Sequence, residues 1–492
     1  MSKKKKTIED LFNEAIVLVE EEPYLVPKNW VWTKLGKVGN YYNGRAFKPT
    51  EWSDKGRPII RIQDLTGTNK GEPNYFVGQV AEKHEITKGD LLISWSATLG
   101  AYIWNGADAV LNQHIFKVES FIDKKYHYFA MQQFISSLYS KTHGSGMVHV
   151  TKKVFDETPF PLPPLNEQKR IAEKIESLLN KTEEVKKLIK EAKETLILQI
   201  NAVLNKAYKG DLTQQWRKSN ISKFTREEFV AQLSAERINL SRSKRDKEYY
   251  IERFNSLLLE QPKNIPNDWV MVEFELICDN ITKGTTPKTS EITFEGDVPF
   301  LKVYNIVDNQ IDFEFKPGFI PKTVHENKLK RSIVYPGDVL MNIVGPPLGK
   351  VAIVPPTYPE WNINQAIAIF RPIKDVLNEY IYYSLLYEKT LEEVFQGTRG
   401  VVGQSNISLE QCRKLKLALP PLEEQIKIVE TIKSTFERLK VVENNINHLS
   451  SVLEKTEKSV MSKAFRGELG TNDLNDENAI ELLKKMIQEQ VK

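Results

Sequence analysis

The sequence is poor in cysteine. It has only Cys278 and Cys412 among 492 residues, which is too few for a disulfide framework and lacks the paired spacing of a zinc site. It also has no run of about 18 consecutive apolar residues, the length that a membrane-spanning helix needs. The Lys3–Lys6 run is followed by Thr7–Asp10 (TIED) instead of an apolar segment, so no export signal is expected. These absences predict a cytoplasmic protein with reduced thiols.

Neither positively nor negatively charged residues dominate the composition. There are 69 Lys and Arg residues against 65 Asp and Glu, for a net charge of +4. Such a small excess permits nucleic-acid binding but does not argue for it. The 40% share of hydrophobic residues excludes a disordered chain, and the length predicts two to four domains of roughly 100 to 200 residues each.

The motifs of several enzyme classes are missing. Gly345–Lys350 (GPPLGK) has three residues between its glycines where a phosphate-binding loop needs four, and Val351 replaces the metal-binding Ser or Thr. The string nearest to an amino-methyltransferase motif, Val354–Tyr358 (VPPTY), lacks the Asn or Asp that would hold the target amine. No dinucleotide-binding glycine pattern follows a predicted strand, and the seven histidines form no His-x-x-x-His pair. The chain is therefore predicted to be non-catalytic, with no metal or cofactor of its own.

What the sequence does contain is an internal repeat. Residues Pro27–Val31 (PKNWV) recur as Pro266–Val270 (PNDWV), and Pro163–Gln168 (PPLNEQ) recurs as Pro420–Gln425 (PPLEEQ). Three further pairs match in the same order: Gly89-Asp90 with Gly337-Asp338, Asn112-Gln113 with Asn364-Gln365, and Lys206–Gly210 with Lys463–Gly467. The offset between copies grows up to the PPLxEQ motif and then stays constant. Each copy therefore has a front half of variable length and a back half of constant length.

The back half of each copy predicts one long helix. Apolar residues follow an alternating spacing of four and three from Ile171 to Val203 and from Ile428 to Val460, which is typical of a coiled-coil seam. Proline pairs precede both segments, and Gly210 and Gly467 stand where a left-handed stop residue belongs. The polar interruptions of the seam are Thr182, Gln199, Thr435 and Thr456. About 45 residues at 1.5 Å each make a rod of roughly 65 Å.

The front halves predict mixed domains. Short apolar runs bounded by Gly, Pro and Asn are typical of strands, and a helical stretch is expected after them, over residues 126–139 in the first copy and 379–395 in the second. The runs are Pro58–Ile62, Leu91–Trp95, Ile115–Val118, Phe300–Val303, Val339–Ile343 and Ala368–Phe370. Charged helices that begin with capping boxes at Thr7 and Thr225 precede the two copies.

This order of variable domain, PPLxEQ motif and constant helix, given twice, resembles the specificity subunits of type I restriction-modification systems. The likeness covers nearly the whole chain and is strongest at the two PPLxEQ motifs and at the helix ends Lys206–Leu212 and Lys463–Leu469. It implies an α+β fold: two mixed α/β target-recognition domains in tandem, each followed by a long helix, with the two helices forming an antiparallel coiled coil. The implied division is an N-terminal helix (1–26), recognition domain 1 (27–162), spacer helix 1 (163–212), a charged helical linker (213–263), recognition domain 2 (264–419), spacer helix 2 (420–469) and a helical C-terminal tail (470–492).

The resemblance also implies a function. Each recognition domain would read one half of a bipartite site in double-stranded DNA, and the coiled coil would set the gap. Two methyltransferase subunits and restriction/motor subunits would join this chain, and S-adenosylmethionine, ATP and Mg would belong to them. The complex would be an N6-adenine DNA methyltransferase and an ATP-dependent endonuclease. The alternative is a non-enzymatic coiled-coil scaffold that binds protein partners.

Residue types select candidates for DNA contact. Forked donors and amides read base edges, while Lys, Arg, Ser and Thr bind phosphates. In the first domain the candidates are Arg45, Lys48, Arg61, Gln63, Ser96, Thr98, Gln113, Lys152 and Lys153. In the second they are Lys283, Lys288, Lys302, Asn305, Asn342, Lys350, Gln365 and Arg399. Asn112-Gln113 and Asn364-Gln365 could equally be buried amides that bond a turn, and Trp30 and Trp269 are expected to be core anchors.

Overall fold

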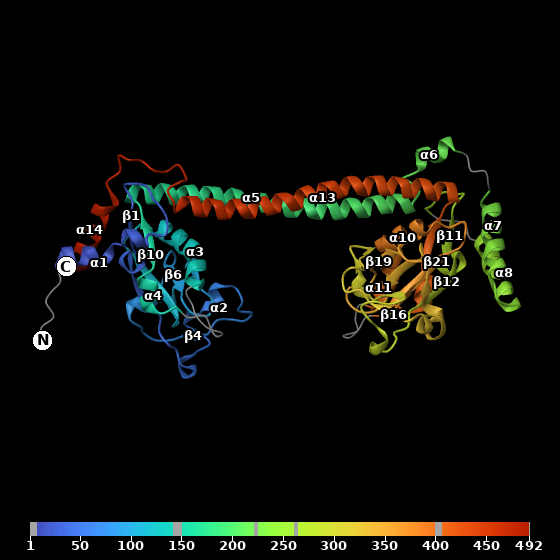
Figure 1. Cartoon of the computed structure of the whole chain (residues 1–492), viewed down its shortest axis with the longest axis horizontal. Coiled ribbons are helices and arrows are strands. Elements are labelled where there is room, and N and C mark those ends of the chain that lie inside the picture. Colours follow the sequence, from blue (N-terminus) through green and yellow to red (C-terminus); the bar gives the residue numbers. More distant parts are fainter. Residues whose placement is uncertain (1–6, 141–149, 221–224, 260–263, 399–405, 492) are drawn as a thin grey trace. The chain divides into compact units, whose positions relative to one another are not determined.

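The computed structural model describes residues 7–140, 150–220, 225–259, 264–398 and 406–491. The chain forms two compact units. Unit 1 comprises Met1–Ile189 with Asn447–Lys492, and unit 2 comprises Lys190–Ile446. Each unit contains one globular domain, called here the first and the second domain, and parts of the same two long helices (Figure 1).

The first domain is built from two four-stranded sheets and a strand pair. One sheet is antiparallel and the other contains a parallel pair, β3 with β8. The antiparallel sheet has the order β2 (Gly39–Asn43), β9 (Ile115–Ser120), β6 (Leu91–Ser94) and β7 (Gly100–Ile103). The second sheet has the order β4 (Tyr75–Phe76), β3 (Arg57–Ile60), β8 (Ala109–Leu111) and β5 (Glu85–Ile86), and β1 (Val31–Lys34) pairs with β10 (Pro159–Leu162). The α-helices among its described residues are α2 (Ile62–Leu65), α3 (Lys124–Ser140) and α4 (Lys152–Asp156).

The second domain repeats this plan, which confirms the prediction of two mixed α/β domains in tandem. Its antiparallel sheet has the order β12 (Cys278–Lys283), β21 (Ile367–Pro372), β18 (Val339–Asn342) and β19 (Val351–Ile353). Its other sheet is β16 (Phe319–Ile320), β13 (Val298–Leu301), β20 (Trp361–Ile363) and β17 (Ile333–Val334), with β13 and β20 parallel. The strand pair is β11 (Val270–Glu273) with β22 (Lys416–Leu419), and a small hairpin, β14 (Ile306–Val307) with β15 (Gln310–Ile311), is added.

In the second domain, one helix that the sequence predicts is divided into two helices. The sequence predicts a continuous helix over 379–395, but α10 (Asn378–Leu386) and α11 (Glu388–Thr398) are separated at Tyr387. Tyr387 stacks on Tyr208 at 5.3 Å between ring centres, and its hydroxyl donates to Asn205 Oδ1 at 2.7 Å. Contacts with a distant part of the chain therefore override the local helical pattern. Among the described residues, the other α-helices of the domain are α9 (Phe274–Ile277) and α12 (Leu409–Lys414).

The two long helices are α5 (Leu165–Tyr208, 44 residues) and α13 (Leu422–Ala464, 43 residues). They run antiparallel within each unit. In unit 1 the start of α5 shares a core with the end of α13, and Thr182 Oγ1 donates to Glu457 Oε1 at 2.8 Å. In unit 2 the end of α5 shares a core with the start of α13. The antiparallel coiled coil is confirmed.

The predicted seam is not buried along its whole length. Ile171, Ile175 and Ile432 are fully buried where a globular domain also packs on the helices, but Val442 is 45% exposed and Leu449 is 53% exposed. Outside these cores the burial of seam residues varies, because Leu196 and Ile446 are buried while Val442 and Leu449 are exposed. Gly210 and Gly467 adopt φ angles of 80° and 73°, as the predicted left-handed stop requires.

The PPLxEQ motif joins each domain to its helix. Trp30 Nε1 donates to Glu167 Oε2 at 2.7 Å, and Trp269 Nε1 donates to Glu424 Oε2 at 2.8 Å. The following glutamine closes the proline turn in both copies, with Nε2 to the carbonyl of Pro163 at 2.8 Å and of Pro420 at 2.9 Å. Both tryptophans are buried, which confirms them as core anchors.

Further helices complete each unit. In unit 1, α1 (Ile8–Ala15) packs against α14 (Ala479–Val491), and in unit 2, α7 (Arg226–Asn239) packs against α8 (Lys244–Leu259). The capping boxes predicted at Thr7 and Thr225 are both formed. A short helix, α6 (Gln214–Ser219), follows α5. In the part of the chain that the structure describes, no helix is long and apolar enough to cross a membrane.

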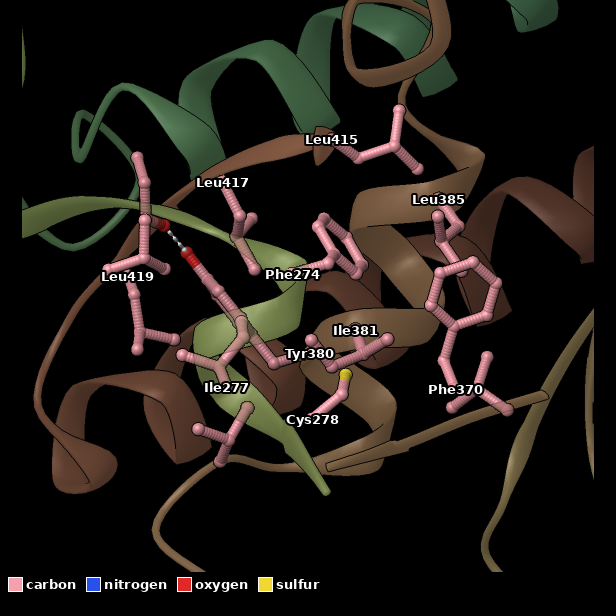
Figure 2. Close-up of a cluster of buried hydrophobic side chains, with 14 of the residues drawn as sticks. Phe274, Ile277, Cys278, Phe370, Tyr380, Ile381, Leu385, Leu415, Leu417 and Leu419 are labelled. Atoms are coloured by element: carbon pink, nitrogen blue, oxygen red, sulfur yellow. Dashed lines mark hydrogen bonds between the residues drawn. The ribbon is translucent and has the colours of Figure 1, made fainter. Parts of the chain in front are cut away.

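The core of the second domain contains both cysteines. Figure 2 shows Cys278 beside Phe274, Ile381 and the Tyr380 side chain, whose hydroxyl donates to the carbonyl of Ala418 at 2.7 Å. Burial raises the pKa of the Cys278 thiol well above its usual value and raises that of Cys412 to about 12. Both thiols are therefore held protonated.

We expect neither thiol to react with a maleimide in the folded protein, because the thiolate is the reactive form and both sulfurs are buried. Mass spectrometry after a short labelling pulse should find no adduct, whereas the same pulse in denaturant should label both residues. Labelling of either thiol under native conditions would contradict their place in this core.

Candidate nucleic-acid interface

The two parallel strands of each domain end at one edge. In the first domain the amide of Asn112, which follows β8, donates to the carbonyl of Ile60 at the end of β3 at 3.0 Å. In the second domain the amide of Asn364 donates in the same way to Leu301 at 3.0 Å. The segments that leave the carboxyl ends of these strands therefore lie side by side.

A glycine brings a third segment to this edge in each copy. A Cβ atom on Gly44 would lie 2.0 Å from the carbonyl oxygen of Asn112, and one on Gly284 would lie 2.1 Å from that of Asn364. Only glycine permits so close a backbone approach. The chain leaving Gly44 carries Arg45 and Lys48, so these predicted candidates are brought to the same edge as those that follow β3 and β8.

In the first domain the exposed candidates at this edge are Lys48, Gln63 and Gln113. Arg61 is half-buried, and its guanidinium lies 4.6 Å from the centre of the Trp52 ring. Arg45 behaves differently, because it pairs with Glu51 and lies over the Phe47 ring at 4.7 Å. Its charge is used to hold the loop.

In the second domain the exposed candidates are Lys283, Lys288 and Gln365. Lys302 is half-buried, with its ammonium 5.8 Å from the centre of the Tyr304 ring. Lys350 Nζ donates to the carbonyl of Ile306 at 3.1 Å and so supports the β14–β15 hairpin. The two edges thus present related sets of cations and amides on one scaffold.

Three candidates are buried, which corrects their selection as base contacts. Asn305 Oδ1 accepts from the amide of Lys302 at 3.0 Å, and its Nδ2 donates to the carbonyl of Phe315 at 2.8 Å. Asn342 Nδ2 donates to the carbonyl of Pro347 at 2.8 Å, and its Oδ1 accepts from the amide of Lys350 at 2.7 Å. Ser96 is only 5% exposed. The side-chain amides of Asn305 and Asn342 both stabilise turns, because short polar side chains readily form hydrogen bonds with nearby backbone groups.

The other first-domain candidates lie on different segments. Thr98 is exposed in the turn between β6 and β7, and Lys153 is exposed on α4. Lys152 forms an ion pair of 2.5 Å with Asp156, one helical turn away. Arg399 lies outside the described residues.

Several surface aromatic residues escaped the sequence criteria. Trp52 is 39% exposed, Tyr304 37% and Phe315 48%. Lys316 lies 5.1 Å from the Phe315 ring centre and 5.9 Å from that of Tyr304. The available signal was a lysine within two residues of an aromatic side chain in a predicted loop, as at Lys302 and Tyr304, because aromatic and cationic groups together suit nucleobases and phosphates.

Equivalent carboxylates order the two loops. Glu51 Oε2 accepts from the amide of Lys48 at 2.9 Å, and Glu291 Oε2 accepts from that of Lys288 at 2.7 Å. The Lys48 amide and then Arg45 lower the pKa of Glu51, and Lys328 and then the Lys288 amide lower that of Glu291. Both carboxylates are therefore ionised near neutral pH. Among the described residues, no cluster of three His, Cys, Asp or Glu side chains could hold a metal ion.

Comparisons with known proteins agree with this repeat. A family model described as the type I restriction modification DNA specificity domain matches residues 27–194 and again 266–450. The chain is 27% identical to the type I restriction enzyme EcoBI specificity subunit of Escherichia coli, over 90% of this chain and 86% of that protein. It is 26% identical to the MjaVIII specificity subunit of Methanocaldococcus jannaschii, over 92% and 95%.

Solved structures share the fold. A chain from a structure of the type I R-M system, solved to describe its assembly and conformational transition, superposes with a TM-score of 0.66 at 19% identity, covering 91% of this chain and 100% of that one. The HsdS subunit from Thermoanaerobacter tengcongensis gives a TM-score of 0.52 at 20% identity, covering 92% and 100%. At such identities the likeness concerns the fold alone.

Proposed function

Because the chain belongs to the family of type I restriction-modification DNA specificity domains, we propose that it is the sequence-specific DNA-binding subunit of a type I complex. Each domain reads one half of a bipartite site. One observation carries this proposal: the same sheet edge is built twice, and each copy presents exposed amides and cations of the types that contact bases and phosphates.

The coiled coil gives the two half-sites a fixed gap. α5 and α13 differ in length by a single residue, at 44 and 43. A continuous helix is stiff and rises 1.5 Å per residue. We infer that this pair sets the number of unread base pairs.

The chemistry belongs to partner subunits in this proposal. Two methyltransferase subunits bind this chain and hold S-adenosylmethionine, while restriction/motor subunits hold ATP and Mg. The chain itself contributes no catalytic residue and no cofactor. The complete complex would methylate adenine at N6 and cleave DNA in an ATP-dependent reaction.

The test is co-expression with a cognate methyltransferase subunit, followed by base-resolution mapping of N6-methyladenine. We expect one bipartite motif, with two defined halves around a constant gap. We also expect the DNA affinity of the purified complex to fall steeply with salt, because neutralising phosphates releases counterions.

The scaffold alternative makes the opposite prediction. A coiled-coil protein that binds only protein partners would leave the genome unmethylated and would show no salt-dependent affinity for duplex DNA. The DNA-binding function is favoured because each domain exposes a lysine and a glutamine at equivalent positions. These residues are Lys48 with Gln113 and Lys288 with Gln365.

A further inference from the structure

The turns after β3 and β13 are equivalent in detail. The amide of Arg61 donates to Asp64 Oδ2 at 2.8 Å, and the amide of Lys302 donates to Asn305 Oδ1 at 3.0 Å. Each turn directly follows the strand of the parallel pair. Arg61 therefore corresponds to Lys302, and Gln63, one residue before the accepting side chain, corresponds to Tyr304.

The side chains at these corresponding positions differ in chemistry. Gln63 is exposed, and Tyr304 is 37% exposed. The Arg61 fork is supported by the Trp52 ring, whereas the Lys302 ammonium lies near the Tyr304 ring. One scaffold thus presents an arginine and an amide in the first domain, but a lysine and a phenol in the second.

The flanking positions are the same in both copies. Lys48 and Lys288 both begin a loop that is closed by a glutamate three residues later. Gln113 and Gln365 both follow the asparagine at the end of the second parallel strand and are both exposed. Because these positions carry the same residues in both copies, the positions at which the copies differ are better suited to make one half-site different from the other.

We propose that Arg61 with Gln63, and Lys302 with Tyr304, form one equivalent base-reading position in each domain and make the two half-sites different. This inference rests on the proposed function. Arginine pairs in a bidentate manner with guanine O6 and N7, and glutamine with adenine N6 and N7. Lysine donates to guanine as a single point, and an aromatic ring packs on the thymine methyl group.

Hydrogen bonds support the loop that carries Tyr304 at both of its ends. Asn309, at the tip of the β14–β15 hairpin, accepts from the Tyr382 hydroxyl at 3.1 Å and, through Oδ1, from the amide of Val351 at 3.2 Å. The buried Asn305 holds the other end of the loop. A binding group held by such supports keeps its geometry, as sequence readout requires.

Nearby acidic groups favour base contacts over phosphate contacts at this loop. Asp308, Asp312 and Glu314 are exposed in the same segment as Lys316. Carboxylates repel a phosphate backbone but can accept from cytosine N4. The acidic groups make the Tyr304 loop better suited to base edges than to phosphates, while Lys288 on the adjoining loop is suited to phosphates.

The test exchanges the two pairs in the full chain, co-expressed with its methyltransferase partner. One variant combines Arg61→Lys with Gln63→Tyr, and the other combines Lys302→Arg with Tyr304→Gln. We expect each variant to change the preferred base in its own half-site, by roughly 5- to 150-fold per contact. The other half-site and the gap should stay as in the unmodified protein. The single changes Gln63→Ala and Tyr304→Ala should relax one half-site each.

Two controls separate this inference from its premise. Phe294→Ala, at a side chain that is 83% exposed in the second domain, should leave the motif unchanged. Lys288→Gln should lower methylation at all sites alike. If the unmodified complex methylates a bipartite motif and folded exchange variants keep that motif, or lose methylation at every site alike, the inference is wrong. If the unmodified complex leaves DNA unmethylated, the proposed function itself fails.

Discussion

Replacing Glu424 by glutamine is expected to destabilise unit 2 strongly. The Glu424 carboxylate is 2% exposed and accepts from Trp269 Nε1 at 2.8 Å and from Thr213 Oγ1 at 2.6 Å. It also pairs with Arg217, whose own Nη2 donates to the carbonyl of Gly210 at 2.8 Å. A neutral amide leaves the Arg217 cation without its counter-charge in a largely buried place.

The expected loss is about 3 to 5 kcal/mol, the usual cost of removing one partner from a buried ion pair. For a domain of this size, each kcal/mol lowers Tm by roughly 2 to 4 °C. Calorimetry should therefore show the transition of unit 2 moved down by roughly 6 to 20 °C.

The first copy supplies a matched control in Glu167. Its carboxylate accepts from Trp30 Nε1 at 2.7 Å and from Asn472 Nδ2 at 2.9 Å, both neutral donors. Burial raises the pKa of Glu167, so the folded state holds the charged form at a cost. Glu167→Gln removes that cost, and we expect it to change the free energy of unfolding by less than about 1 kcal/mol. Equal destabilisation by the two glutamines would refute the assigned role of the Arg217 cation.

The sign of the pH dependence follows from the same carboxyl group. A folded-state pKa above the unfolded value means that Glu167 contributes most stability below its unfolded pKa. That contribution is lost as the pH rises through the folded pKa. Glu167→Gln should therefore flatten the pH dependence of unit 1 stability in the acid range.

The sequence predicted the features that depend on hydrophobic periodicity and on helix-breaking residues. Seam spacing, the proline pairs and the two stop glycines located both helices, and the repeat predicted the tandem domains. The sequence could not predict which polar residues are buried. Asn305 and Gln63 are both amides in loops. The side chain of Asn305 donates hydrogen bonds to the backbone carbonyls of Asp312 and Phe315 in its own loop. Gln63 remains exposed.

The sequence criteria identified only some of the residues at the candidate interface, because they did not consider which residues lie next to one another in three dimensions. Criteria based on charge and amides selected Arg61, Gln63 and Lys302 but passed over Trp52 and Tyr304, which support or accompany them. In the sequence, an exposed aromatic residue cannot be distinguished from an aromatic residue of the core. Only the three-dimensional neighbours of the ring distinguish the two.

Deleting residues 470–492 is expected to unfold unit 1 at a much lower temperature. Four apolar side chains of α14, at Ala479, Leu483, Met486 and Ile487, are at most 4% exposed and belong to the core that contains Trp30. The deleted segment also carries Asp476, which pairs with Arg170 at 2.5 Å. Burying each larger side chain contributes about 1.5 to 3 kcal/mol, as an upper estimate.

The measurement is limited proteolysis with calorimetry of the whole chain. The deletion should expose unit 1 to protease and leave unit 2 protected, because residues Lys190–Ile446 include none of the deleted segment. A shorter deletion, of residues 488–492, is the control, since residues 488–490 are exposed, and it should change little. If the longer deletion also leaves unit 1 resistant, α14 is an appendage. If it does not, α14 is an integral part of unit 1, and the folding of the first domain depends on a segment more than 300 residues away from it in the sequence.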